Sequence, residues 1–268
     1  MKQNKFFIAF LLFTTHCSIF TGFAQTWEEL IQITGKYIAV KNIDSALANA
    51  DKALKIAINS SPSKHALTLG MIGQIYFDNG NFDKAAEYFL TEKNLKNTFL
   101  GSSNPSYAVS LNNLSSAYQY LGKFDEAEKL LIEAVEIKNS TNIKDTILAK
   151  SYHNLGKIYH STGLFGKSEE NYLKALTIKK EVCGEEHPLY ANTLYNLGLL
   201  YKSYGNFENA EDNLINALKI YTGAGKKDLI RDVELQLALV YNEENKTKEF
   251  SEHSTWEGYK RSIIIPDI

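Results

Sequence analysis

The sequence predicts an all-α fold, a right-handed superhelical solenoid of about six antiparallel helix pairs. A tyrosine recurs every 39 to 42 residues, glycine, aromatic and small residues follow most of these tyrosines in one order, and the apolar residues between them keep helical spacing. The recurring tyrosines are Tyr37, Tyr76, Tyr118, Tyr159, Tyr201 and Tyr241. Because a fixed period of this length reflects stacked supersecondary units, residues 25–268 are expected to form one solenoid.

The first 24 residues have the layout of a cleavable signal peptide. Lys2 and Lys5 precede an uncharged run over residues 6–13, and small residues, Gly22 and Ala24, end the segment. Export to the periplasm or the cell exterior is therefore expected, although residues 6–23, if uncleaved, are nearly long enough to anchor the chain in a membrane. Cleavage removes two lysines and moves the formal net charge from −2 to −4, so no nucleic-acid partner is expected.

Each helix pair is expected to turn at a glycine four residues after the tyrosine. Glycine adopts the left-handed conformation that ends a helix without a Cβ penalty. A phenylalanine two residues later should fill the wedge between the paired helices, and the small residue three positions beyond it should let the second helix approach the first closely. The four turns contain Gly80, Gly122, Gly163 and Gly205; Phe82, Phe124, Phe165 and Phe207; and Ala85, Ala127, Ser168 and Ala210.

The repeats are expected near residues 27–58, 65–97, 107–138, 147–180 and 190–222, with a capping unit at 228–260. The first repeat has Lys41 where the others have the turn glycine, and the turn of the last unit, at residues 245–247, lacks the aromatic. Terminal units of solenoids are commonly atypical because one face meets water. Pro62, Pro105 and Pro188 are expected at the starts of first helices, where proline is well tolerated.

The order leucine-glycine, tyrosine, alanine, aromatic, alanine resembles the tetratricopeptide repeat, and four units within residues 65–222 match it in phase. Residues 101–108 and 184–191 look like the sequence between repeats in kinesin light chains and in the wider group of tetratricopeptide proteins with 42-residue repeats. The resemblance implies that the first helix of each pair lines a concave groove, and that this groove binds a protein or an extended peptide.

A column of amide side chains is expected to face the groove. One residue before the packed leucine or isoleucine, five of six repeats carry Asn or Gln: Gln32, Asn113, Asn154, Asn196 and Gln236. A carboxamide both donates and accepts hydrogen bonds, so such a column can pair with the backbone of an extended peptide. The resemblance implies that Asn113, Asn154 and Asn196 contact the peptide. In the alternative interpretation, these amides bond neighbouring helices and keep the stack in register.

Further polar side chains should surround the amides. The remaining predicted groove residues are Asn112, Ser116, Gln119 and Tyr120 from the third repeat, His153, Lys157 and His160 from the fourth, and Tyr195 and Lys202 from the fifth. Lys150, Lys157 and Lys202 share these faces, which favours a partner with acidic character in a protein that is itself net acidic. The alternative is that these lysines form an ordinary solvated face.

Catalytic and cofactor-binding motifs are not found in the sequence. It contains no Gly-rich phosphate loop after a strand, no Gly-x-Ser-x-Gly elbow and no helix with the paired histidines of zinc proteases. His153 and His160 lie two helical turns apart without a third ligand of suitable spacing, so no metal is expected. The sequence predicts a non-enzymatic, exported scaffold or adaptor. The alternative is a sensor region that regulates a separate or lost catalytic domain, since similar arrays precede caspase-like protease or kinase domains in bacterial proteins.

Overall fold

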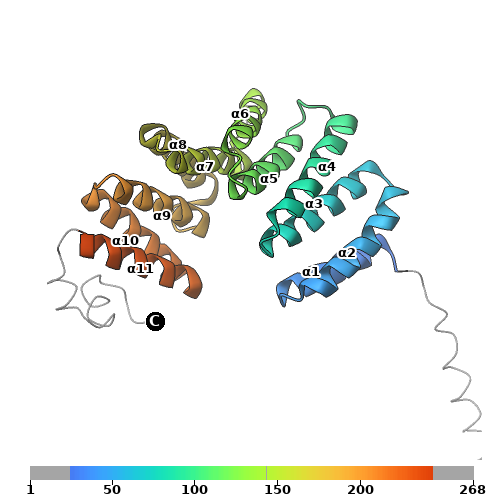
Figure 1. Ribbon diagram of the computed structural model, residues 1–268, viewed down its shortest axis with the longest axis horizontal. Helices are drawn as coiled ribbons and strands as arrows, with labels where there is room; N and C mark the ends of the chain where they lie inside the picture. Colours follow the sequence, from blue (N-terminus) through green and yellow to red (C-terminus); the bar gives the residue numbers. More distant parts are fainter. Residues whose placement is uncertain (1–24, 143, 244–268) are drawn as a thin grey trace, which may run out of the picture.

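The computed structural model describes residues 25–142 and 144–243, and the predicted signal peptide and the end of the predicted capping unit lie outside these ranges. Within them the chain forms eleven helices and no strand, which confirms the all-α prediction (Figure 1). The helices are α1 (Trp27–Ala39), α2 (Ile43–Ile58), α3 (Pro62–Asp78), α4 (Phe82–Leu100), α5 (Tyr107–Tyr120), α6 (Phe124–Ser140), α7 (Thr146–Ser161), α8 (Phe165–Cys183), α9 (Pro188–Ser203), α10 (Phe207–Gly223) and α11 (Lys227–Glu243).

The helices stack in chain order into a curved solenoid. Each helix packs on the next one along the chain, and contacts also join α3 to α5, α5 to α7, α7 to α9 and α9 to α11. Figure 1 shows an arch with α1 and α11 at its two ends, in which α3, α5 and α7 lie on the inner side and α4, α6 and α8 on the outer side. The first helices of successive pairs therefore form the concave face.

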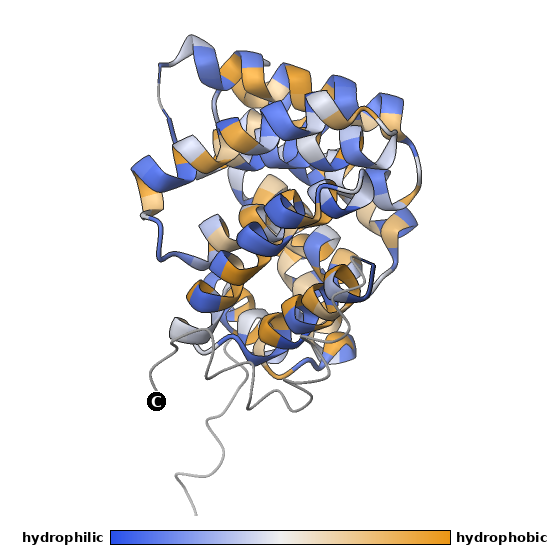
Figure 2. Cartoon of the chain, turned by 90° about the vertical axis from the view of Figure 1, so that its left-hand side faces the viewer, coloured by the Kyte–Doolittle hydropathy of each residue, from blue (hydrophilic) through white to orange (hydrophobic). Residues whose placement is uncertain are grey.

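The helices are amphipathic, and hydrophilic and hydrophobic residues alternate along them in Figure 2. This pattern is expected where each helix buries one stripe against its neighbours and leaves the other in water. Among the helices of the described ranges, none combines the length and apolar character that crossing a bilayer requires.

The spacing of tyrosine and glycine follows from the hydrogen bonds at the end of each first helix. Gly80, Gly122, Gly163 and Gly205 have φ between 72° and 80°, as predicted. The backbone N–H of the residue after each glycine donates to the carbonyl of the tyrosine five positions earlier, at 2.8–2.9 Å. This is the bond of a Schellman cap. In the first repeat Lys41 adopts φ of 56° and makes the same turn without glycine.

The paired helices approach closely at a small residue from each partner. Ala85, Ala127, Ser168 and Ala210 have no exposed surface, which confirms their predicted place between the helices. The first helices contribute Gly73, Gly156 and Gly198, where an added Cβ would lie 2.6–2.8 Å from the side chains of Phe89, Tyr172 and Leu214. These three large side chains are themselves at most 1% exposed. The bulk of the second helix thus packs directly on the backbone of the first.

The inter-repeat prolines differ from one another in position. Pro62 and Pro188 are the first residues of α3 and α9, as predicted. The prediction for Pro105 was wrong, because α5 begins two residues later, at Tyr107. There the Asn104 side chain accepts a hydrogen bond from the N–H of Ser106, and the N–H of Tyr107 donates to the Asn104 carbonyl, so this proline lies in a turn before the helix.

Candidate functional site

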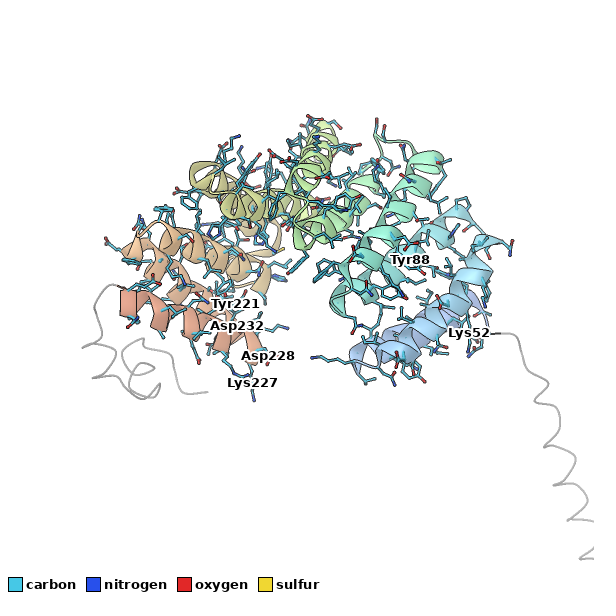
Figure 3. The ribbon with its side chains drawn as sticks, in the orientation of Figure 1. Lys52, Tyr88, Tyr221, Lys227, Asp228 and Asp232 are labelled. Carbon is cyan, nitrogen blue, oxygen red and sulfur yellow. The ribbon has the colours of Figure 1, made fainter. Side chains whose placement is uncertain are left out.

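A cavity of about 460 Å³ opens on the concave face, and α3, α5, α7 and α9 supply most of its lining. Second helices add Phe89 from α4 and Lys179 from α8. Its lining residues are Gln74, Phe77, Phe89, Asn113, Ser116, Gln119, Tyr120, Thr146, Ile147, Lys150, His153, Asn154, Lys157, Lys179, Leu189 and Asn192. The side chains in this middle part of the arch are drawn in Figure 3.

Seven of the twelve predicted groove residues line this cavity. They are Asn113, Ser116, Gln119, Tyr120, His153, Asn154 and Lys157. All seven come from α5 and α7, the first helices of the third and fourth repeats. Candidates from the fifth repeat do not reach the cavity, which takes Leu189 and Asn192 from that repeat instead.

Of the three asparagines expected to contact the peptide, Asn113 and Asn154 form hydrogen bonds between helices and still keep polar atoms for a ligand. Asn113 Oδ1 accepts from Lys150 Nζ at 3.2 Å, and Asn154 Nδ2 donates to Ser116 Oγ at 3.3 Å. Both bonds join α5 to α7, as the stacking interpretation expects. No hydrogen bond among the described residues occupies Asn113 Nδ2 or Asn154 Oδ1. One donor and one acceptor therefore remain beside the cavity.

Asn112 and Asn196 lie outside the cavity lining. Asn112 is fully buried, and its Nδ2 donates to the Ala108 carbonyl at 3.0 Å and to Ser151 Oγ at 2.7 Å. Its amide therefore holds α5 against α7 rather than facing the groove. Asn196 Nδ2 donates to the Asn192 carbonyl at 2.8 Å, one turn earlier in its own helix.

The remaining three candidates lie in contacts between helices toward the carboxyl end of the solenoid. His160 Nε2 lies 2.7 Å from Ser203 Oγ, and Lys202 Nζ donates to Gln236 Oε1 at 2.7 Å, which links α9 to α11. Tyr195 is half-buried, and burial, followed by the nearby Asp232 carboxylate, raises the pKa of its phenol. At these positions the polar groups contact neighbouring helices of the solenoid and do not face the cavity.

The most informative residue that sequence reasoning missed is Lys179. It lies on a second helix, α8, in line with the buried Tyr172, Ala175 and Leu176, and it is only 5% exposed. Its Nζ donates to Thr193 Oγ1 at 2.6 Å. An ionisable residue at an apolar position of a helix is itself a signal, because lysine is almost never fully buried without a partner.

Burial depresses the basicity of every amine in the cavity. It lowers the pKa of Lys179 to about 8 and also lowers the pKa values of Lys150 and Lys157. The pKa of buried His153 falls well below its usual value, because of burial first and of the charges on Lys179, Lys157 and Lys150 next. The imidazole is therefore uncharged at neutral pH, and its Nδ1 lies 3.1 Å from Thr193 Oγ1.

The lining contains three lysines and no aspartate or glutamate. Lys150 bonds to a neutral amide oxygen, and Lys157 Nζ lies over the Tyr120 ring, 5.4 Å from its centroid. The described residues hold no group of three or more His, Cys, Asp or Glu side chains placed to bind a metal ion. The cavity therefore offers a positively charged, donor-rich surface beside aromatic and aliphatic side chains.

We expect Lys179→Met to stabilise the protein at pH 7 and to lose this advantage as the pH rises. With a pKa of about 8 against an ordinary 10.5, the buried ammonium costs roughly 3 kcal/mol below pH 8, and the lost bond to Thr193 offsets roughly 1 of these. The net gain at pH 7 is about 2 kcal/mol. Between pH 8 and 10.5 wild type becomes more stable, because its lysine is already neutral while the unfolded chain still binds the proton.

Urea denaturation of wild type and variant at pH 7 and pH 9.5 measures this difference. Lys129→Met, which changes an exposed lysine on α6, is the matched control and should alter stability little at either pH. A gain of equal size for Lys179→Met at both pH values would argue against a desolvated ammonium at this position.

The structural similarities of the chain extend over most of its length. It is similar to BtubC (BKLC) from P. vanneervenii, with 24% identity over 74% of this chain and 80% of that one and a TM-score of 0.64. A putative kinesin light chain from Podosopora anserina shares 21% identity over 74% and 95% of the two chains, with a TM-score of 0.59. The apo form of RapI shares 16% identity over 90% and 92%, with a TM-score of 0.61. At these identities the likeness concerns the fold.

No curated protein matches the chain in sequence. The tetratricopeptide repeat model, in contrast, matches residues 64–140 and 147–223, which together make up more than half of the chain. Apart from the first residues of α3 and α7, the matched segments contain α3 to α10, and these include every helix that lines the cavity. The chain belongs to the tetratricopeptide repeat family.

Proposed function

We propose that the protein is an exported scaffold or adaptor that holds an extended segment of a partner protein in the cavity between α3 and α9. The observation that carries the proposal is the lining itself, in which unoccupied amide atoms of Asn113 and Asn154 stand beside three lysines without a carboxylate. Tetratricopeptide folds commonly mediate protein–protein interaction, which agrees with a binding role.

The amide atoms suit the backbone of a peptide. Asn113 Nδ2 can donate to a peptide carbonyl, and Asn154 Oδ1 can accept from a peptide N–H, which needs no particular side chain on the ligand. Specificity then comes from charge. With Lys150, Lys157 and Lys179 in the lining, a segment that carries aspartate or glutamate offsets positive charge that the lining leaves uncompensated.

Selection of random peptides on the purified protein tests the proposal. We expect the selected peptides to be enriched in acidic residues, to bind more weakly as salt increases, and to lose affinity in the double variant Asn113→Ala, Asn154→Ala. Loss of about one to two hydrogen bonds corresponds to roughly 10- to 100-fold weaker binding, measured by fluorescence anisotropy.

Asn213→Ala is the matched control. Asn213 lies on α10 outside the cavity, and its Nδ2 donates to the Asn209 carbonyl of its own helix at 2.8 Å. Its replacement should leave affinity unchanged. Equal affinities for wild type and the double variant, with both folded, would refute the assignment of the cavity as the peptide site.

The regulatory alternative, in which the solenoid controls a separate catalytic domain, stays a prediction. It uses the same cavity but requires that peptide binding alter a second protein. No feature of the described residues favours it over the adaptor role.

A further inference from the structure

Two rungs of hydrogen bonds cross from α5 to α7 along the floor of the cavity. Asn113 pairs with Lys150 at 3.2 Å, and Ser116 pairs with Asn154 at 3.3 Å. Residues three or four apart lie on the same face of a helix, so Gln119 on α5 and Lys157 on α7 occupy the next rung. The repeat geometry thus brings these two side chains to adjacent places at the same end of the cavity.

The third rung is not made, because no hydrogen bond joins Gln119 to Lys157 among the described residues. Gln119 Nε2 is buried from solvent and has no hydrogen-bond partner. Lys157 has no ion pair or hydrogen bond among the described residues, and its ammonium lies over the ring of Tyr120, the neighbour of Gln119. A buried donor left without an acceptor is costly, at about 1–3 kcal/mol. Gln119 Nε2 and the Lys157 ammonium are therefore two donors that a ligand with several acceptor oxygens could use together.

The positive charge of the lysines around the rung favours a ligand that carries more than one negative charge. Lys150, Lys157 and Lys179 are all in the lining. Glu92 on α4 is the acidic side chain whose charge reaches Lys150, and it is already paired with Lys96 at 2.7 Å. A single carboxylate offsets one of three ammonium charges. A phosphate monoester carries almost two negative charges at pH 7 and three acceptor oxygens.

An apolar wall stands beside the rung. Phe77 and Phe89 contribute to the lining, and the rings of Phe77 and Tyr120 meet edge to face at 5.3 Å between centroids. Tyr120 is 56% exposed, so its ring offers surface to a ligand. This combination suits a phosphate attached to a ring-sized apolar group.

We propose that the unmade rung between Gln119 and Lys157 is a subsite for a phosphate monoester carried on an aromatic side chain of the bound peptide. Gln119 Nε2 donates to one phosphate oxygen and the Lys157 ammonium to another, while Lys150 contributes charge from the neighbouring rung. The inference deepens the proposed function and rests on it for the peptide. The phosphate subsite itself is testable without any peptide.

Phenyl phosphate and phenyl sulfate are the probes for this subsite. Both carry a ring and three terminal oxygens, but above pH 7 the phosphate is mainly a dianion and the sulfate a monoanion. We expect calorimetric titration of the full chain at pH 7.5 to show that phenyl phosphate binds at least about tenfold more tightly than phenyl sulfate. Inorganic phosphate, which lacks the ring, should bind more weakly than phenyl phosphate.

The variants Lys157→Met and Gln119→Leu locate the binding. We expect Lys157→Met to weaken phenyl phosphate binding by at least about tenfold, and Gln119→Leu by about fivefold or more. Lys129→Met on the outer helix α6 is the control and should bind as wild type. Circular dichroism melting of each variant establishes that it is folded. If Lys157→Met fails to fold, the smaller change Lys157→Gln takes its place.

Equal affinities for phenyl phosphate and phenyl sulfate, or unchanged binding in both variants, would overturn the subsite. So would the absence of any phenyl phosphate binding. If selected acidic peptides bind while phenyl phosphate does not, the peptide-binding function stands and the phosphate subsite fails. If phenyl phosphate binds at this rung and no peptide binds, the phosphate subsite stands and the peptide-binding function fails.

Discussion

Gly156→Ala is expected to lower the free energy of unfolding by about 3 kcal/mol. The new Cβ would lie 2.6 Å from two ring carbons of Tyr172, a side chain with no exposed surface. Because the ring is fully buried, we expect α7 and α8 to move apart or the Tyr172 rotamer to strain, and overpacking of this kind costs about 1–3 kcal/mol or more. Thermal and urea denaturation followed by circular dichroism measure the loss.

Two further variants separate crowding from helix propensity. Gly166→Ala adds the same methyl group in α8 where nothing lies within 4 Å, so it should leave stability equal or slightly higher. Tyr172→Leu in the Gly156→Ala background should recover part of the loss, because the equivalent positions of the third repeat hold Ser115 and Leu131, both fully buried. If Gly156→Ala is as stable as Gly166→Ala, the close approach of α7 and α8 is wrong.

Asp145→Ala is expected to cost about 3–5 kcal/mol. Asp145 caps α7 by accepting from the N–H groups of Ile147 and Leu148, both at 3.0 Å, and it also pairs with the ammonium of Lys138. Lys138 is only 4% exposed. The substitution removes a helix cap and leaves a buried charge without its partner, which is far costlier than the loss of a surface pair.

The same pair predicts a loss of stability in acid. Burial alone raises the pKa of Asp145, but the Lys138 hydrogen bond and the N–H of Leu148 outweigh it, so the pKa is lowered overall from 3.8. The ionised pair therefore stabilises the fold above about pH 4, and this contribution is lost as the pH falls through the lower folded pKa. Glu181→Gln is the control, since Glu181 and Lys144 form an exposed pair that should matter little. Asp145→Ala should flatten the acid limb of the stability curve, and a curve that keeps its wild-type shape would contradict this account.

Much of the fold could be predicted because the same local physics is repeated. A left-handed residue after the first helix, a phenylalanine at the start of α4, α6, α8 and α10 and a small residue at the crossing recur in phase, and each has one structural reason. Even Lys41, which departs from the glycine pattern, was placed correctly by its phase alone. Pro105 was misplaced because Asn104 and Ser106 form a local turn that the spacing of the repeats does not reveal.

The site was less predictable, because its composition depends on how neighbouring helices are rotated against each other. Helical phase places Asn112 and Asn113 side by side, but only the packing of α5 on α7 decides that the first is buried and the second reaches the cavity. Lys179 was missed for a related reason, since its helix is the outer one of its pair. The hydrogen bond to Thr193 that directs it inward joins α8 to α9, two different repeats.

Because the helices contact one another in chain order, the curvature of the solenoid depends on the angles at its successive helix interfaces. Besides packing on second helices, the first helices from α3 to α11 contact one another in chain order, so a small rotation at each interface adds up along the arch. The span from α3 to α9, which sets the width of the cavity, crosses three such interfaces. A ligand that bridges α5 and α7 would fix one of these three interfaces and make the solenoid stiffer. If the proposed ligand binds there, its affinity would depend on the curvature of the arch between α3 and α9.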